Sequence, residues 1–351
     1  MGNKDWYTER WKNKQALKKK TRRLEKLKRN VKKDNSDEDS LELTIYDSDD
    51  PVLGELNQGI LAGLSYPTYT ILSKGKFIQG MTESKEQGGI LSKLSIGDNI
   101  VFDMYDEKPV IMGITQRRSK LVRLRADASR RSQAGAEEQV IAVNMDLAII
   151  VASVAQPTFH PRLVDRYLIV CQYGNIRPLL CLTKIDLAPI PDVSMYRGID
   201  LPVVSISNKT NEGIDQLLPY LNGKCCVLVG NSGVGKSSLV NTLLKREEAL
   251  TGEVSKKSGK GRHTTSAYML HVLDKSTYLI DTPGIRSLGL LDIDKRSLRL
   301  YFPEFHEFAT NCKFNDCTHY HEPDCAVKKA VEEGFISQER YDSYIRILSK
   351  S

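Results

Sequence analysis

The sequence of 351 residues lacks long hydrophobic runs. No apolar stretch approaches the roughly 20 residues that a membrane-spanning helix needs, so we expect no membrane partner. The first residues are charged and contain no apolar signal region, which argues against secretion. Myristoylation of Gly2 is disfavoured because Trp6 stands where that signal has Ser or Thr. We therefore expect a cytoplasmic protein, and the seven cysteines fit a reducing compartment.

Near the N-terminus, a stretch with few acidic residues is followed by a stretch with no basic residue. Residues 1–33 contain 14 Lys/Arg and only 3 Asp/Glu, whereas residues 34–50 contain 8 acidic residues and no basic residue. Neither stretch has enough apolar residues to fold alone, so we expect residues 1–50 to form a flexible arm. The basic part favours a polyanionic partner, RNA in particular, and a solvated tail without a specific partner is the alternative.

Residues 51–135 contain short β-like runs separated by turns rich in glycine. Such a pattern predicts a small closed barrel, with an OB-fold as the leading candidate and a different small β-barrel as the alternative. The end of this segment is rich in basic residues, which suggests a surface that contacts RNA phosphates rather than a merely solvated loop. The candidate RNA-binding residues are Arg117, Arg118, Lys120, Arg123 and Arg125.

Strand-like and helix-like runs alternate over residues 136–290, which predicts a doubly wound parallel sheet. Ligands of such sheets bind at the C-terminal ends of the strands. Four polar motifs each begin where a predicted strand ends, so we expect them to lie together. In chain order they are Thr183–Asp186, Ser207–Lys209, Gly230–Ser238 and Asp281–Gly284.

The third motif matches GxxxxGK[ST] between a predicted buried strand and a predicted helix. That context predicts a loop whose backbone N–H groups surround phosphates, and makes a chance glycine-rich turn the weaker alternative. Lys236 would add a positive charge, and Ser237 would bind Mg²⁺. The loop consists of Gly230, Asn231, Ser232, Gly233, Val234, Gly235, Lys236, Ser237 and Ser238.

The first motif, Thr183-Lys184-Ile185-Asp186, favours guanine over adenine. The Asp186 carboxylate can accept hydrogen bonds from guanine N1–H and the exocyclic amine, and would be unpaired against adenine. The stem of Lys184 can pack along the base. The second motif, Ser207-Asn208-Lys209, resembles the third guanine-contacting loop of GTPases. We therefore predict GTP or GDP as the ligand, and a P-loop kinase that binds ATP is the alternative.

The order of these motifs is a circular permutation, because ordinary GTPases have the phosphate loop first. A permuted GTPase that follows an OB-like domain and precedes a Cys/His segment resembles the ribosome small subunit-dependent GTPase A family, over about residues 55–345. The resemblance implies late maturation of the small ribosomal subunit, binding to its rRNA, and GTP hydrolysis that the subunit stimulates. A non-enzymatic RNA-binding assembly factor with a GTP switch is the alternative.

The fourth motif suggests slow intrinsic hydrolysis. Asp281 would hold Mg²⁺ through a water, and the N–H of Gly284 would contact the γ-phosphate. The next position, where many GTPases have a water-orienting Gln, is Ile285, whose apolar side chain cannot orient water.

A segment rich in glycine and lysine precedes the fourth motif and has the position of a mobile switch. Thr264 or Thr265 would complete the Mg²⁺ shell when GTP is bound. His263 could orient the attacking water, and the family resemblance supports it as the catalytic residue. An exposed loop histidine is the alternative. We expect the ribosomal partner to order this segment.

A late cluster offers three thiolates and one imidazole, a complete tetrahedral set for structural Zn²⁺. The candidate ligands are Cys312, Cys317, His319 and Cys325. The family shares this spacing, which supports the set. His321 and His306 remain alternative fourth ligands.

Together these patterns predict a multi-domain chain. Its parts are a flexible arm (1–50), an all-β OB-fold-like barrel (51–135), an α/β circularly permuted P-loop GTPase domain (136–290) and a small, mostly helical zinc-binding domain (291–351). We expect one structural Zn²⁺ per chain, Mg²⁺ with GTP, and a monomer.

Overall fold

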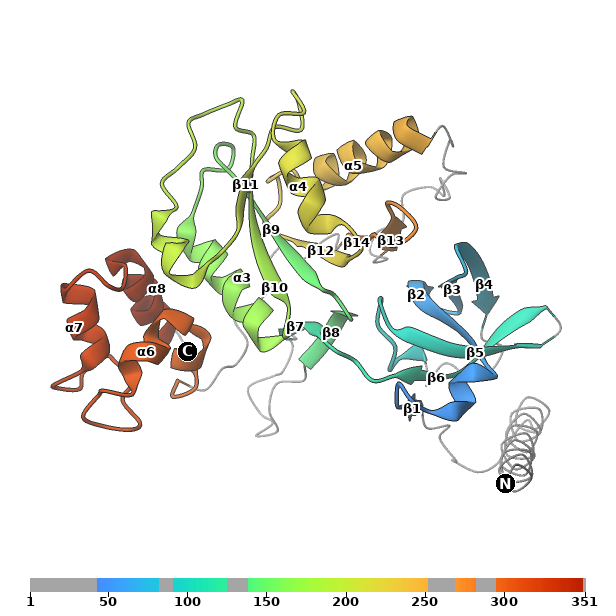
Figure 1. Cartoon of the computed structure of the whole chain (residues 1–351), viewed down its shortest axis with the longest axis horizontal. Coiled ribbons are helices and arrows are strands. Elements are labelled where there is room, and N and C mark those ends of the chain that lie inside the picture. The colour runs from blue at the N-terminus through green and yellow to red at the C-terminus, as the bar shows by residue number, and fades with distance from the viewer. Residues whose placement is uncertain are drawn as a thin grey trace, which may run out of the picture. The chain divides into compact units, whose positions relative to one another are not determined.

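The computed structural model describes residues 43–81, 91–105, 107–124, 138–251, 269–281 and 295–349. Contacts divide these residues into two compact units (Figure 1). Unit 1 comprises residues 43–94 and 98–116, and unit 2 comprises residues 95–97 and 117–349. Within these ranges, no helix combines the length and the apolar character needed to cross a membrane.

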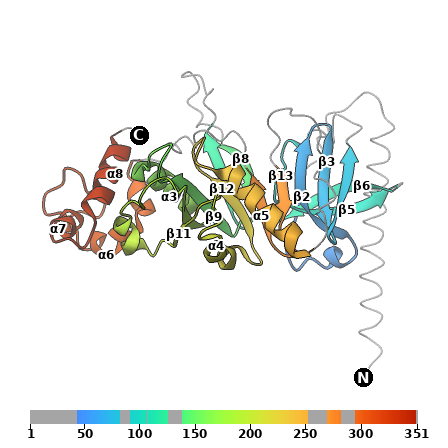
Figure 2. The same ribbon diagram turned by 90° about the horizontal axis from the view of Figure 1, so that it is seen from above.

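Unit 1 is a small β domain (Figure 2). Its elements are β1 (Thr44–Tyr46), the 3-10 helix η1 (Pro51–Gly54), β2 (Asn57–Ser65), β3 (Thr68–Ser73), β4 (Lys76–Met81), β5 (Asn99–Tyr105) and β6 (Lys108–Thr115). Strand β2 pairs antiparallel with β3 and β5, β3 pairs with β4, and β5 pairs with β6. Because β4 also contacts β6, the five strands β2–β6 form a ring around a buried core.

The predicted arm ends earlier than residue 50. Thr44–Tyr46 form β1, which pairs parallel with Gly113–Thr115 of β6. A Cβ atom at position 113 would lie 2.3 Å from the Thr44 carbonyl oxygen, so glycine permits this pairing. Tyr46 is buried with Leu53, Leu56 and Val101. The contact between Tyr46 and Val101 joins residues far apart in the chain, and the short strand lies among acidic residues, so its sequence has no recognisable strand pattern.

Unit 2 contains the predicted parallel sheet. Its strands are β9 (Leu147–Ser153), β10 (Arg177–Thr183), β11 (Val203–Ser205), β12 (Cys225–Val229) and β14 (Tyr278–Asp281). The parallel order is β14-β12-β9-β10-β11, and β13 (Met269–Val272) pairs antiparallel with β14. These strands alternate with helices, as the sequence pattern over residues 136–290 predicts, and β13 is an additional strand.

Helices cover both faces of this sheet, as expected for a doubly wound fold (Figure 1). The helices are α3 (Pro161–Tyr173), α4 (Ile214–Leu221) and α5 (Lys236–Thr251). Apolar residues of α4 and α5 share one core cluster with Leu147, Ile149 and Val151 of β9. Helix α3 lies on the other face (Figure 1).

The boundary between the units differs from the one expected after residue 135. Residues 117–124 belong to unit 2, where β7 (Lys120–Leu124) pairs antiparallel with β8 (Glu138–Val143). The Arg118 backbone N–H donates to Asn144 Oδ1, and the Ser119 hydroxyl donates to the Met145 carbonyl. These bonds tie the start of the basic segment to the connection between β8 and β9.

The C-terminal module, residues 295–349, belongs to unit 2. Its elements are η3 (Leu298–Tyr301), η4 (Pro303–Phe305), α6 (His306–Ala309), α7 (Ala326–Glu332) and α8 (Gln338–Leu348). Phe302, Phe305 and Tyr344 form its aromatic core, with ring centroids 5.0–5.3 Å apart. Helices α7 and α8 agree with the mostly helical character that the sequence predicts for this segment.

Candidate functional site

The loop between β12 and α5 requires glycine at three positions. Gly230, Gly233 and Gly235 have φ values of 148°, 81° and 97°, which other residues rarely adopt. A Cβ atom on Gly230 would also lie 2.3 Å from the Val151 carbonyl oxygen. The loop can therefore turn tightly at the end of the sheet and begin α5 with its backbone N–H groups unobstructed.

Lys236, the first residue of α5, folds over this loop. Its Nζ donates to the carbonyl oxygens of Gly230 at 2.6 Å and Asn231 at 2.7 Å. Burial lowers the pKa of Lys236, and the charge of Asp281 at the end of β14 opposes that shift. The loop thus places one ammonium group at its centre, next to the strand that ends in Asp281.

The motif after β10 is anchored to the same loop. The buried Thr183 donates its hydroxyl hydrogen bond to the Val234 carbonyl at 2.6 Å. Lys184 Nζ donates to the Gly233 carbonyl at 2.7 Å and to the Gln156 carbonyl. The base-binding and phosphate-binding motifs predicted from the sequence are therefore in direct contact.

The motif after β11 holds Asp186. The buried Ser207 hydroxyl donates to Asp186 Oδ1 at 2.7 Å and accepts the backbone N–H groups of Lys209 and Thr210 at 3.2 Å. Asn208 Nδ2 donates to the Gly235 carbonyl at 3.5 Å. The Asp186 side chain is exposed, so its carboxylate is oriented while remaining accessible to a ligand.

The structure thus brings the first three motifs, and Asp281 of the fourth, to the C-terminal ends of neighbouring strands. Ser232, Ser237 and Ser238 are exposed on the loop, whereas Val234 is buried beneath it. Asp281 ends β14 next to β12. Other predicted site residues lie outside the described residues, namely Arg125, His263, Thr264, Thr265 and Gly284, as does Ile285.

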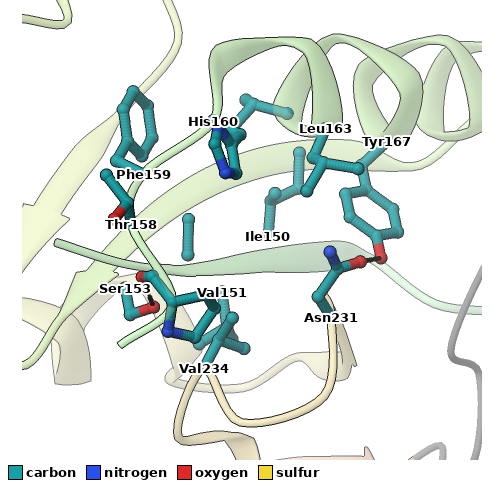
Figure 3. Close-up of a pocket in the computed structure, with 13 residues that line it drawn as sticks. Ile150, Val151, Ser153, Thr158, Phe159, His160, Leu163, Tyr167, Asn231 and Val234 are labelled. Atoms are coloured by element: carbon teal, nitrogen blue, oxygen red, sulfur yellow. Dashed lines mark hydrogen bonds between the residues drawn. The ribbon is translucent and has the colours of Figure 1, made fainter. Parts of the chain in front are cut away.

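A cavity of about 40 Å³ lies beside the phosphate loop, between the end of β9 and the start of α3 (Figure 3). Val151, Phe159, His160, Tyr167 and Asn231 are among the residues that line it. The Tyr167 hydroxyl donates to Asn231 Oδ1 at 3.2 Å. No motif indicated Tyr167, because at the sequence level it is one more apolar position of an amphipathic helix.

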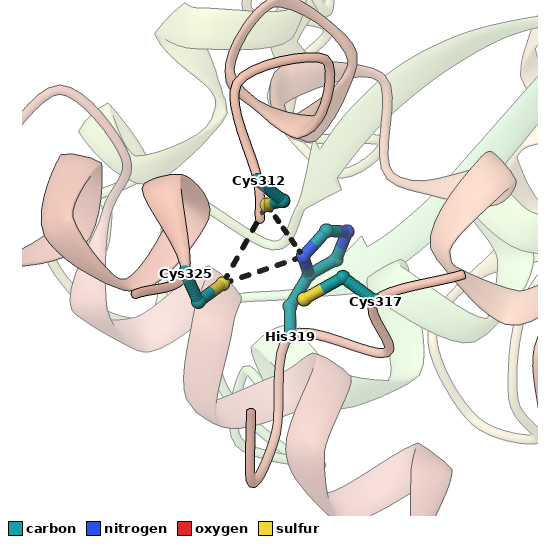
Figure 4. Close-up of side chains that lie close together, drawn as sticks. All are labelled: Cys312, Cys317, His319 and Cys325. Carbon is teal, nitrogen blue, oxygen red and sulfur yellow. Dashed lines mark hydrogen bonds between the residues drawn. The ribbon is translucent and has the colours of Figure 1, made fainter. Parts of the chain in front are cut away.

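The Cys/His cluster is assembled in the C-terminal module (Figure 4). Ligand atoms of Cys312, Cys317, His319 and Cys325 all lie within 4.8 Å of one another. His319 Nδ1 lies 3.6 Å from Cys312 Sγ and 3.5 Å from Cys325 Sγ, and these two sulfurs are 3.9 Å apart. A tetrahedral zinc site has edges of about 3.5 Å between N and S and about 3.8 Å between sulfurs. The donor set and its spacing fit a metal ion.

The two alternative histidines lie elsewhere. His321 is exposed, and its ring lies against the Tyr320 ring with centroids 3.6 Å apart and planes tilted by 44°. The His306 ring is hydrogen-bonded through Nε2 to the Leu300 carbonyl at 3.1 Å. The loop that presents His319 is fixed by Glu322, which accepts the Thr318 backbone N–H and hydroxyl. Although burial opposes ionisation, these bonds keep the pKa of Glu322 at about 2.

Two of the candidate RNA-binding residues make contacts within unit 2. Arg118 forms an ion pair with Asp146 at 2.9 Å, and Asp146 also accepts the Cys225 backbone N–H. Lys120 Nζ lies 4.9 Å from the centre of the Tyr173 ring. The Arg118 side chain is nevertheless 64% exposed. These two residues therefore support the fold of unit 2 as well as presenting positive charge.

Strand order, the glycine-rich loop and the strand-end motifs define a P-loop nucleotide-binding domain with permuted motif order. Comparisons with known proteins agree. The model of the RsgA GTPase family matches residues 114–291. A curated Chlorobaculum parvum protein, small ribosomal subunit biogenesis GTPase RsgA, is 39% identical over 276 residues, which cover 76% of this chain and 88% of that protein.

Two solved structures have the same architecture. YjeQ from Thermotoga maritima superposes with a TM-score of 0.65 at 29% identity, covering 84% of this chain and 98% of that one. YloQ, described as a circularly permuted GTPase, gives a TM-score of 0.63 at 29% identity, covering 84% and 94%. The chain therefore belongs to the RsgA GTPase family and is a GTP-hydrolysing enzyme.

Proposed function

We propose that this enzyme binds the small ribosomal subunit and its rRNA, assists late maturation of that subunit, and hydrolyses GTP slowly until the subunit stimulates it. The convergence of the strand-end motifs on one loop carries the nucleotide part of the proposal. The ribosomal part is supported by the name of curated relatives, small ribosomal subunit biogenesis GTPase.

Guanine in this proposal binds to the motifs after β10 and β11. Asp186, oriented by Ser207, accepts hydrogen bonds from the base, and the stem of Lys184 packs along it. Thr183 and Asn208 contribute by joining these motifs to the phosphate loop. Lys209 completes the pocket from the exposed side.

The phosphates of GTP bind to Gly230–Ser238 in this proposal. Backbone N–H groups of the loop and the N-terminus of α5 contact the phosphate oxygens, and Lys236 turns its ammonium group from the loop carbonyls toward them. Ser237, Asp281 and one of Thr264 and Thr265 would hold Mg²⁺, and Gly284 would contact the γ-phosphate. When bound, the ion would neutralise phosphate charge.

Hydrolysis in this proposal uses His263 to orient the attacking water. The segment that contains His263 separates α5 from β13 in the sequence, so it adjoins two elements of the nucleotide domain. Subunit binding would order this segment, and turnover would rise because the histidine then has a fixed position.

The C-terminal module would hold one structural Zn²⁺ through Cys312, Cys317, His319 and Cys325. All four positions of a tetrahedral shell are then filled by protein, so the ion stabilises the module.

Unit 1 would be an OB-fold, since its ring of strands has the pairings of a five-stranded Greek-key barrel. In this proposal unit 1 and the basic residues Arg117, Arg118, Lys120, Arg123 and Arg125 contact rRNA. The enzyme would act as a cytoplasmic monomer.

The decisive experiment measures GTP turnover by the full chain with and without purified small subunits. Stimulated turnover is expected, and equal turnover with and without the subunit would contradict the proposed stimulation. His263→Ala should remove most of the stimulation at saturating subunit. Unchanged stimulated turnover would exclude His263 from the mechanism. Comparable competition by ATP and GDP against labelled GTP would contradict the guanine assignment.

A further inference from the structure

Helix α3 carries buried contacts on two opposite sides. Asp165 and Tyr167 are two residues apart, so they lie about 3 Å apart along the helix axis and about 200° apart around it. Both are buried, with exposures of 1% and 5%. Asp165 accepts a hydrogen bond from Arg340 of α8, whereas Tyr167 reaches the phosphate loop (Figure 3). Less than one turn of α3 therefore joins the C-terminal module to this loop.

Asn231 is the point at which Tyr167 reaches the loop. Its side chain accepts the Tyr167 hydroxyl at 3.2 Å, and its carbonyl accepts Lys236 Nζ at 2.7 Å. Burial raises the pKa of Tyr167 to about 12, so the hydroxyl carries its proton. A constraint on Asn231 thus restricts both the loop backbone and the lysine that it holds.

The contact on the other side of α3 is a buried charge cluster. Arg340 is 2% exposed, and its Nη1 lies 2.5 Å from Asp165 Oδ1 while its Nε lies 2.6 Å from Glu304 Oε1. The Phe302 ring covers the guanidinium at 4.7 Å. Because hydrogen-bonded charges are strongly directional where water is excluded, this cluster fixes α3 against the module.

We propose that Tyr167 is a positioning residue for the phosphate loop and that the C-terminal module sets its position through α3. The inference rests on the proposed role of Gly230–Ser238 in binding the phosphates of GTP. Tyr167 holds Asn231, and the Arg340–Asp165 pair holds the helix that carries Tyr167. A partner that displaces the C-terminal module would therefore change nucleotide affinity through this helix.

The first test compares nucleotides on the full-length Tyr167→Phe chain. Displacement of a fluorescent guanine nucleotide should show about 2- to 10-fold weaker binding of GDP and GTP, the effect of one hydrogen bond. GMP should bind as it does to the wild type, because it lacks the β- and γ-phosphates that the loop surrounds. An equal loss for GMP would show general damage to the fold, and no loss for GDP would overturn the proposal.

Tyr69→Phe is the matched control. It removes another buried tyrosine hydroxyl, which donates to the Pro109 carbonyl at 2.6 Å within unit 1. GDP affinity should not change in this variant. A loss equal to that of Tyr167→Phe would attribute both effects to lower stability and would contradict the positioning role.

The second test asks whether Arg340 and Tyr167 act through one path. Arg340→Lys keeps the charge but loses the planar fork that reaches two carboxylates. It should weaken GDP binding in the wild-type background and cause no further loss in Tyr167→Phe. Additive losses, or wild-type affinity in Arg340→Lys, would overturn the link through α3.

Lys236→Ala distinguishes an error in the proposed phosphate site from an error in the positioning role of Tyr167. If this variant binds GDP like the wild type, the proposed phosphate site is wrong. If it loses GDP binding while Tyr167→Phe does not, the phosphate site stands and the positioning role of Tyr167 is refuted.

Discussion

Arg340→Met tests the buried charge cluster between α3 and the C-terminal module. Methionine keeps an unbranched apolar stem but has no guanidinium, so it leaves Asp165 and Glu304 without their partner. Removing one member of a buried pair destabilises a protein by about 3–5 kcal/mol. A domain of this size loses about 2–4 °C of Tm per kcal/mol, so we expect Tm to fall by about 6–20 °C.

The loss should depend on pH. Burial raises the pKa of Asp165, and the charge of Arg340 opposes that shift in the wild type. Without Arg340 the pKa rises further above its value in the unfolded chain. A carboxyl group with a raised folded-state pKa favours folding below its unfolded pKa, and this contribution is lost as pH rises through the folded pKa. The gap in Tm between variant and wild type should therefore narrow as pH falls from 7.5 toward about 5.

The assay measures thermal unfolding of both chains by scanning calorimetry at several pH values. Arg346→Met provides the control, because Arg346 is exposed on the same helix and the same substitution there should cost no more than about 1 kcal/mol. If Arg340→Met were as stable as Arg346→Met at pH 7.5, or if its deficit grew on acidification, the reasoning about the buried cluster would be refuted.

Three further predictions concern the nucleotide and metal sites. Thr183→Val leaves the Val234 carbonyl without its buried donor and should lower the free energy of unfolding by about 1–3 kcal/mol. Thr68→Val removes an exposed hydroxyl and should change it by less than about 0.5 kcal/mol. Equal losses of the two variants in thermal unfolding would contradict this prediction. In competition assays, Asp186→Asn should weaken GDP binding at least about tenfold and improve the binding of xanthosine diphosphate, because an amide can donate to the xanthine 2-oxo group. A variant that still prefers guanine would exclude Asp186 from base recognition. Cys317→Ser should bring zinc, measured by elemental analysis, below one ion per chain, while His321→Ala should retain it; full zinc in Cys317→Ser would refute the ligand set.

The elements that the sequence predicted well are those whose signal is local. The buried runs that became β9, β10 and β12 contain consecutive apolar residues, and such runs specify strands of a parallel sheet without reference to distant contacts. The phosphate loop likewise depends on glycines whose positive φ values are properties of single residues.

Other features depended on contacts between residues far apart in the chain. Strand β1 exists because it pairs with β6 across about 70 residues, and acidic neighbours concealed it. The β7–β8 pairing assigned residues 117–124 to unit 2, which moved the boundary from the position expected after residue 135. A sequence pattern assigns such residues by their neighbours in the chain. It therefore predicts the start of unit 1 and the boundary between the two units poorly.

The sequence by itself determined the class of chemistry, because Gly230–Ser238 and Thr183–Asp186 carry their meaning in residue type and spacing. Only the tertiary structure decided that His319, and not His321, faces the three cysteines. It also decided that Tyr167 contacts the phosphate loop and that Arg340 joins α8 to α3. The reason is physical: the direction of a side chain and the identity of its buried partner are set by packing between distant segments, and no local pattern specifies either.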